Sequence, residues 1–265
     1  MHAFEYHRPG SAKEALALAA KKKEGRYLAG GQSLVQAMKL RLSSPTDLID
    51  LGILKDLSFV KASASAVEIG AMTRHADVAA SKDVRKAIPA LAALAGMIGD
   101  RQVRHMGTCG GSIANSDPAA DYPAAVLGLG ATITTNKRKI EADKFFTGLY
   151  ETALEAGELI TSVSFPVPKR AAYMKFKNPA SRFAIVGVFV ADFGGKVRVG
   201  VTGAGACAFR QADLEKALSA KFAPEAAAAI KVKPDGLNND LHASPEYRAH
   251  LITVMAKRAV EAALK

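Results

Sequence analysis

The chain has 265 residues, of which 49% are apolar and 23% charged, a composition typical of a globular protein with a sizeable core. No run of about 18 uncharged apolar residues predicts a membrane-spanning helix, and the first residues lack the apolar core of a secretory signal. Two cysteines, Cys109 and Cys207, are too few for a four-cysteine iron–sulfur or zinc site. We therefore expect a reduced, cytoplasmic protein without a metal site of its own.

The net charge of +11 is compatible with a nucleic-acid-binding module. The basic residues are spread along the whole chain, however, and form only short clusters at 21–23 and 137–139. There is no zinc-finger spacing and no Lys/Arg-Gly-Phe-Gly-Phe type of aromatic motif, and tryptophan is missing. We favour a solvated basic surface, or one that meets acidic partners, over nucleic-acid binding.

The first predicted unit, residues 1–55, has an α/β pattern. Ser11 and Glu14 form a capping box at the start of its first helix. We expect helices over residues 12–22 and for about ten residues from Ser33, and strands over 27–29 and 48–51. The strand that runs into Gly30-Gly31 brings backbone N–H groups and the start of a helix to one loop, which is a plausible anion site.

The second unit, residues 56–168, also mixes strands and helices. Strands are expected at 58–60, 66–70, 131–135, 139–141 and 159–165, and helices at 73–80, 88–98 and 118–127. Asp117 and Pro118 fit the cap and first position of the last of these helices. The third unit, residues 169–265, is expected to hold a strand over 173–177, a hairpin over 183–193 and 196–202 joined at Gly194-Gly195, and then three helices.

The residues from Thr108 to Asp121 carry the strongest chemical signal. Paired glycines beside hydroxyl side chains let a ligand approach the backbone closely, which suits a diphosphate. Thr108 and Ser112 can donate to phosphate oxygens, and Asp121 is suited to accept from a ribose hydroxyl. Asp117 either caps a helix or contacts the ligand. Arg104 and His105 either lie near the diphosphate or are solvated side chains.

Several common sites are missing from the chain. No Gly-x-Gly-x-x-Gly sequence opens a helix, no Walker A sequence occurs, and no Gly-x-Ser-x-Gly turn is present. The six histidines show no zinc-ligand spacing. A self-contained hydrolase or metalloenzyme is therefore disfavoured.

Residues 107–121, together with 29–34 upstream, resemble the FAD-binding medium subunit of the molybdenum hydroxylases, the family of xanthine dehydrogenase and carbon monoxide dehydrogenase. The likeness continues at 70–75, at 173–176 and at 244–248, so it spans nearly the whole chain. The fold class that it implies is α+β: a two-part FAD-binding domain of the vanillyl-alcohol-oxidase (PCMH) type, in the ranges 1–55 and 56–168, followed by a C-terminal domain over 169–265. That domain would hold a three-stranded antiparallel sheet with helices.

The resemblance also implies cofactor-binding residues. Two segments would bind the FAD diphosphate: Ala29, Gly30, Gly31, Gln32, Ser33 and Leu34, and then Thr108, Gly110, Gly111 and Ser112. Asp121 would contact the sugar region, Lys175 would lie near the isoalloxazine ring, Arg26 near the cofactor, and Ile160 against the ring. Cys109 replaces a usual aliphatic residue, and we favour a small buried side chain over a redox-active thiol.

The implied function is that of an oxidoreductase subunit, with FAD in this chain and no catalytic residue for substrate hydroxylation. Molybdopterin and [2Fe–2S] clusters would be held by a large and a small partner subunit, in a dimer of heterotrimers. Electrons would pass from the iron–sulfur subunit to FAD and on to a quinone, NAD or O₂. A free-standing FAD-dependent oxidase is the alternative, although neither a large substrate cap nor a base near the ring is evident.

Overall fold

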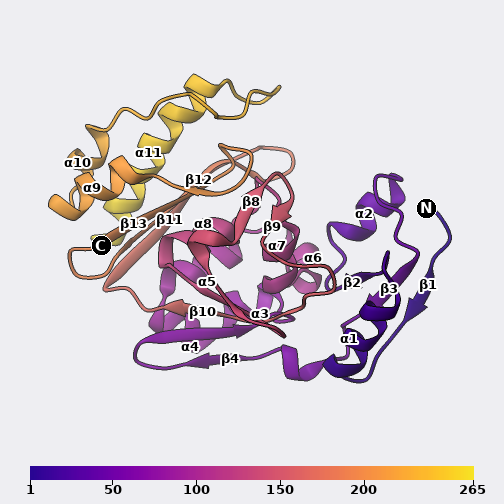
Figure 1. The fold of residues 1–265 in the computed structure, drawn as a ribbon. Helices are drawn as coiled ribbons and strands as arrows, with labels where there is room; N and C mark the ends of the chain where they lie inside the picture. Colours follow the sequence, from indigo (N-terminus) through magenta and orange to yellow (C-terminus); the bar gives the residue numbers. More distant parts are fainter.

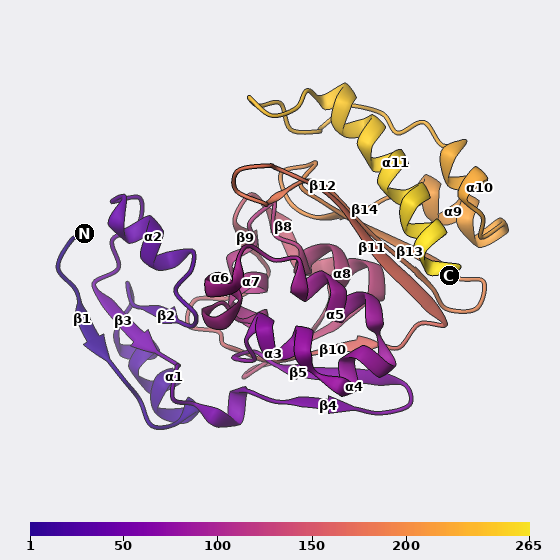
Figure 2. The same ribbon diagram turned by 180° about the vertical axis from the view of Figure 1, so that it is seen from behind.

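The computed structural model describes residues 1–265 and contains three larger sheets, arranged in chain order. Figures 1 and 2 show the N-terminal unit at one end of the molecule, the middle of the chain at the centre, and the C-terminal helices on the far side. The predicted α+β class is confirmed. The three sheets fall within 1–55, 56–168 and 169–265, whereas the boundaries themselves stay a prediction.

The N-terminal unit is a parallel sheet of order β1-β3-β2 covered by helix α1. Its elements are β1 (Glu5–His7), α1 (Ala12–Lys21), β2 (Arg26–Leu28), α2 (Leu34–Lys39) and β3 (Asp47–Asp50). Ser11 caps α1 by accepting from the Glu14 N–H at 3.2 Å, as the capping box predicts. The α2 helix is shorter than expected, and Ser33 makes no side-chain capping bond to it.

The middle of the chain builds a sheet of order β4-β5-β10-β6-β7, in which the paired strands are antiparallel. Its strands are β4 (Val60–Ala62), β5 (Ala66–Gly70), β6 (Thr132–Thr135), β7 (Lys139–Glu141) and β10 (Ile160–Pro166). A separate pair is β8 (Phe146–Gly148) and β9 (Glu151–Thr152). The helices are α3 (His75–Ala80), α4 (Lys82–Ala87), α5 (Pro89–Gly96), α6 (Arg101–Met106), α7 (Cys109–Asn115) and α8 (Tyr122–Leu129).

The C-terminal part is an antiparallel sheet of order β11-β12-β13-β14. The expected three strands are present, and a two-residue fourth strand joins them. The elements are β11 (Arg170–Lys177), β12 (Ala184–Asp192), β13 (Val197–Thr202), β14 (Phe209–Arg210), α9 (Ala212–Ala220), α10 (Pro224–Ala228) and α11 (Pro245–Ala263). Every residue of β12 is buried, because α8 packs on one face of this sheet and α11 on the other.

The largest hydrophobic cluster lies where α5 and α8 meet both the middle and the C-terminal sheet. Figure 1 shows these two helices between β10 and β11. The α8 helix is buried along its whole length, which fixes the middle of the chain rigidly against the C-terminal sheet. No helix is long and apolar enough to cross a membrane.

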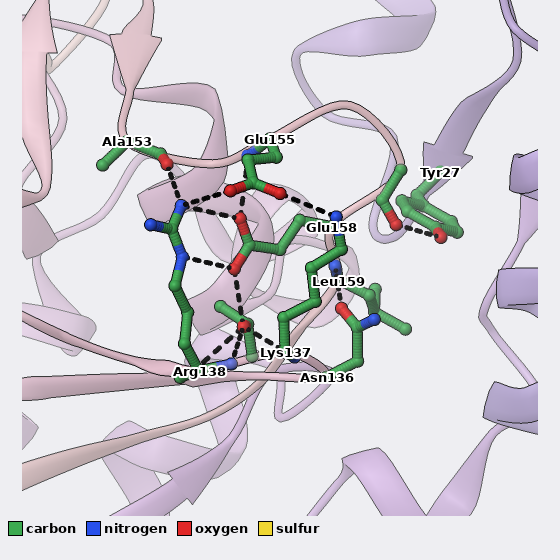
Figure 3. A network of polar contacts seen from close by, with 10 residues as sticks. Tyr27, Asn136, Lys137, Arg138, Ala153, Glu155, Glu158 and Leu159 are labelled. Atoms are coloured by element: carbon green, nitrogen blue, oxygen red, sulfur yellow. Dashed lines mark hydrogen bonds and ion pairs between the residues drawn. The ribbon is translucent and has the colours of Figure 1, made fainter.

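A polar network joins the β6–β7 hairpin to the segment before β10 (Figure 3). The Glu158 carboxylate accepts from Arg138 Nε at 3.1 Å, from Thr135 Oγ1 at 2.7 Å and from the Glu155 N–H at 2.8 Å. The Tyr27 hydroxyl donates to the Gly157 carbonyl oxygen at 2.9 Å. The Tyr27 hydrogen bond therefore links the N-terminal unit to residues 157–158, which Arg138 also contacts through Glu158.

This network predicts acid-sensitive stability. Burial alone would raise the pKa of Glu158, but hydrogen bonds from Arg138, the Glu155 N–H and Thr135 outweigh it and lower the pKa to about 2 from 4.5. A lowered carboxyl pKa stabilises the folded state above pH 4.5, and this contribution is lost as the pH falls towards 2. We expect Glu158→Gln to remove about 2 kcal/mol of unfolding free energy at pH 7 and less at pH 3. Urea titrations at both pH values measure this, and an equal loss at both would contradict it.

Candidate functional site

The two glycine segments lie directly against each other, on either side of the junction between the N-terminal unit and the middle of the chain. The segment after β2 meets the end of α6, and Figures 1 and 2 both show these parts side by side. A Cβ atom on Gly30 would lie 2.1 Å from the Met106 carbonyl oxygen and 2.6 Å from Gly107 Cα. Only glycine fits at position 30, because any side chain would push the two segments apart.

The first segment presents a run of free backbone donors. None of the N–H groups from residue 29 to residue 34 donates a hydrogen bond within the chain. Gly31 has φ +71, and Ser33 follows in the right-handed region. Successive N–H groups around such a left-handed residue form a concave site that binds anions. The Ser33 side chain makes no capping bond, so its hydroxyl is available to the same ligand.

The second segment is the first turn of α7, where the sequence predicts no helix. Thr108 caps this helix, and its Oγ1 accepts from the Gly111 N–H at 3.1 Å. The N–H groups of Cys109 and Gly110 donate to the carbonyl oxygens of Thr73 and Ala71. Side-chain hydroxyls, rather than these amides, are therefore what the second segment offers a ligand: the hydroxyl hydrogens of Thr108 and Ser112 have no acceptor in the chain.

Gly110 is required for packing. Its N–H bonds to Ala71 at 2.8 Å, and a Cβ atom there would lie 2.5 Å from the Ala71 Cβ. Cys109, beside it, is fully buried, and burial raises the pKa of its thiol to about 12. The protonated thiol behaves as a small core side chain, as the sequence analysis favoured.

Asp121 and Lys175 form a buried ion pair, 54 residues apart in the chain. Lys175 Nζ lies 2.9 Å from Asp121 Oδ1, and their side chains are only 3% and 4% exposed. The Tyr173 hydroxyl donates to the same carboxylate at 2.6 Å. Burial raises the pKa of Asp121, and the charge of Lys175 and the hydrogen bonds from Tyr173 and Lys175 oppose that rise. The two residues predicted to contact different parts of a cofactor therefore act as one unit.

Tyr173 was missed by the sequence analysis as a site residue. It lies two positions before Lys175 on β11, and alternate residues of a strand point to the same side. The strand pattern around Lys175 could therefore have indicated it.

The predicted helix start at Asp117 is wrong, because α8 begins only at Tyr122. Ser116 has φ +46, so the chain turns before Asp117. Thr202 Oγ1 lies 2.9 and 2.6 Å from the carbonyl oxygens of Pro118 and Ala120, and the Gly203 N–H donates to Pro118 at 2.7 Å, so these carbonyls bond to the C-terminal sheet rather than within a helix. Asp117 instead accepts from the Ala119 N–H at 2.8 Å in a local turn.

The other predicted residues lie apart from this cluster, except Arg104, which lines the same cavity as Lys175. Ile160 is buried in the main core at the start of β10. Arg26 is exposed on β2 and makes no ion pair. Arg104 donates to the Ile98 carbonyl oxygen at 2.9 Å, whereas His105 is exposed and bonds back to Arg101. No group of three or more His, Cys, Asp or Glu side chains could hold a metal ion.

Comparison with known proteins identifies the protein family to which this chain is related. Residues 2–168 match the family described as the FAD binding domain in molybdopterin dehydrogenase. The chain is 35% identical to the carbon monoxide dehydrogenase medium chain of Afipia carboxidovorans, covering 98% of this chain and 96% of that one. It is 34% identical to the nicotine 6-hydroxylase medium subunit of Paenarthrobacter nicotinovorans, covering 97% and 96%.

Comparison with solved structures supports the same family. A chain of Cu,Mo-CO dehydrogenase superposes with a TM-score of 0.88 at 34% identity, with 99% of this chain and 98% of that one covered. Quinoline 2-oxidoreductase from Pseudomonas putida 86 gives a TM-score of 0.88 at 28% identity, with 99% and 97% covered. The fold and the site thus define an FAD-binding oxidoreductase subunit. The chain belongs to the FAD-binding medium subunits of the molybdenum hydroxylase family.

The residues present fit FAD. The cofactor carries a diphosphate, and the run of free N–H groups over residues 29–34 supplies donors for its oxygens. The Gly30 contact with Met106 brings the hydroxyls of α7 to the same place.

Proposed function

We propose that this chain is the FAD-carrying electron-transfer subunit of a molybdopterin/[2Fe–2S]/FAD hydroxylase or dehydrogenase. The observation that carries the proposal is the cradle of free amides over residues 29–34, closed by the start of α7. When bound, FAD supplies the means to accept electrons singly and to release them in pairs. Electrons would come from an iron–sulfur partner and leave to an external acceptor.

The chain's own residues would hold and tune the cofactor. The N–H groups of 30–34 and the hydroxyls of Ser33, Thr108 and Ser112 would bind the diphosphate. Asp121, through its remaining lone pairs, would accept from the sugar region, and Lys175 beside it would place a positive charge near the ring. The resemblance also proposes Arg26, Ile160 and Asp117 as cofactor contacts, and these residues lie outside the cluster formed by the two glycine segments and the Asp121–Lys175 pair.

The partners proposed are a [2Fe–2S] small subunit and a molybdopterin large subunit, in a dimer of heterotrimers. Support comes from the relatives, whose names describe medium chains or medium subunits of dehydrogenases and hydroxylases. One related structure is described as carbon monoxide dehydrogenase lacking the Mo-pyranopterin part of its molybdenum cofactor.

Purification of the tagged chain from its native host tests this function. We expect two co-purifying polypeptides, with molybdenum, iron and about one flavin per copy of this chain. An organic substrate should bleach the flavin absorption of the complex but not that of the isolated chain. A chain that purifies alone and is reduced directly by an organic substrate would favour the free-standing oxidase instead.

A further inference from the structure

The segment that joins α7 to α8 is held by the C-terminal sheet. Residues 116–121 lead from the end of α7 to Asp121, the carboxylate of the candidate site. The Gly203 N–H donates to the Pro118 carbonyl oxygen at 2.7 Å, and the Ala184 N–H donates to the carbonyl oxygen of the next residue at 3.3 Å. The backbone just before Asp121 is therefore placed by residues far along the chain, at the start of β12 and just after β13.

These two donors lie where the C-terminal sheet opens. The pairing of β12 with β13 stops at Gly187, so the first three residues of β12 pair with no residue of β13. Arg248, near the start of α11, bridges this opening. Its Nη1 donates to the carbonyl oxygens of Ile185 at 2.7 Å and of Gly203 at 2.8 Å. One guanidinium nitrogen therefore joins the two parts of the sheet that hold the segment before Asp121.

Gly203 connects Arg248 to that segment directly. It has φ +85, and a Cβ atom on it would lie 2.6 Å from the carbonyl oxygens of Ala184 and Ile185, so glycine is required for this close approach. Its N–H bonds to Pro118, whereas its carbonyl oxygen accepts from Arg248. A displacement of the arginine side chain is therefore transmitted to Pro118 through a single residue.

The Arg248 side chain is buried at a cost in free energy. It is 3% exposed, and its Nε has no hydrogen-bond partner. Its carboxylate partner, Asp240, lies 2.6 Å from Nη2 and is 46% exposed. Burying a charge with an unpartnered donor costs free energy that an apolar side chain of the same size would not. What the arginine provides in return is geometry, because one planar guanidinium holds two carbonyl oxygens and a carboxylate at once.

We propose that Arg248 is a positioning residue for the cofactor, which holds residues 118–120 against the sheet and so sets the place of Asp121. The proposal rests on the proposed function, in which Asp121 contacts the sugar region of FAD. Both side-chain partners of Asp121, Tyr173 and Lys175, lie on β11 of the same sheet. The carboxylate is thus fixed from its backbone and from its side chain by one frame. Figure 2 shows α11 across this sheet from α8, so Arg248 acts through the strands between them.

A double-mutant cycle on the FAD affinity of the full chain tests the proposal. Arg248→Met keeps the length of the side chain but removes the donors to both carbonyl oxygens, and we expect it to weaken FAD binding about tenfold. In the background Asp121→Asn/Lys175→Met, where no carboxylate reaches the sugar, the same change should weaken binding by less than about twofold, since residues that act through one another are not additive. Arg248→Lys keeps the charge and a smaller donor group, and should give a smaller loss with the same dependence on background.

Thr253→Val is the matched control on the same helix. The Thr253 hydroxyl donates to the Ile230 carbonyl oxygen at 2.9 Å, so its loss should lower the unfolding free energy without changing FAD affinity. Wild-type affinity in folded Arg248→Met would overturn the proposal, as would an equal loss in both backgrounds, which marks a purely structural residue. If Arg248→Met does not fold, the cycle with Arg248→Lys decides by the same criterion. A wild-type chain that binds no FAD would instead contradict the proposed function itself.

Discussion

Gly30→Ala is expected to weaken FAD binding strongly. The new Cβ would lie 2.1 Å from the Met106 carbonyl oxygen, so the first glycine segment must move away from α6 and α7. The free amides of one segment and the hydroxyls of the other would then no longer meet at one diphosphate. We expect FAD affinity to fall roughly a hundredfold, about 2.7 kcal/mol.

Flavin absorbance per chain after gel filtration measures the effect, and circular dichroism verifies that the variant is folded. Gly10→Ala is the matched control, because Gly10 has an ordinary φ and a Cβ there meets nothing closer than 3.7 Å. A folded Gly30→Ala protein with a full complement of FAD would show that the contact between the segments is not needed.

Lys175→Met is expected to lower both stability and the flavin reduction potential. The substitution leaves the Asp121 carboxylate buried with Tyr173 as its remaining partner. Removing one member of a buried ion pair costs about 3 kcal/mol of unfolding free energy. Loss of a positive charge near the ring would disfavour the reduced anion, so the potential should become more negative.

The double variant Asp121→Asn/Lys175→Met separates the two effects. It carries no buried carboxylate at position 121, so its unfolding free energy should exceed that of Lys175→Met. Its potential should stay low, because the positive charge is still missing. If Lys175→Met leaves the potential of the bound flavin unchanged, Lys175 does not lie near the ring.

The sequence predicted the main strands and hairpins because their signals are local. The alternation over β6 and β7, the Gly194-Gly195 turn and the Ser11 cap each depend on residues within a few positions. The sequence did not predict that a helix, α7, begins in the second glycine segment. Two glycines in one turn disfavour a helix by about 1 kcal/mol each, and bonds to Ala71 and Thr73, far back in the chain, help to hold this one.

The candidate site could be predicted as a set of residues but not as an arrangement. Glycine pairs and hydroxyls identify both segments, yet nothing near Gly30 indicates that Met106 will lie against it. In the same way, Asp121 and Lys175 each suggest a ligand contact alone. Their pairing depends on the packing of α8 against the C-terminal sheet, which only the folded chain contains.

Titration of the FAD-free chain with FAD and with riboflavin tests most directly whether the two segments hold the diphosphate. Riboflavin has the same ring but no diphosphate, so it cannot use the amides of residues 30–34. We expect FAD to bind at least about a hundredfold more tightly than riboflavin, and Gly30→Ala to remove most of that difference. Equal affinity for the two flavins in the wild-type chain would contradict the account.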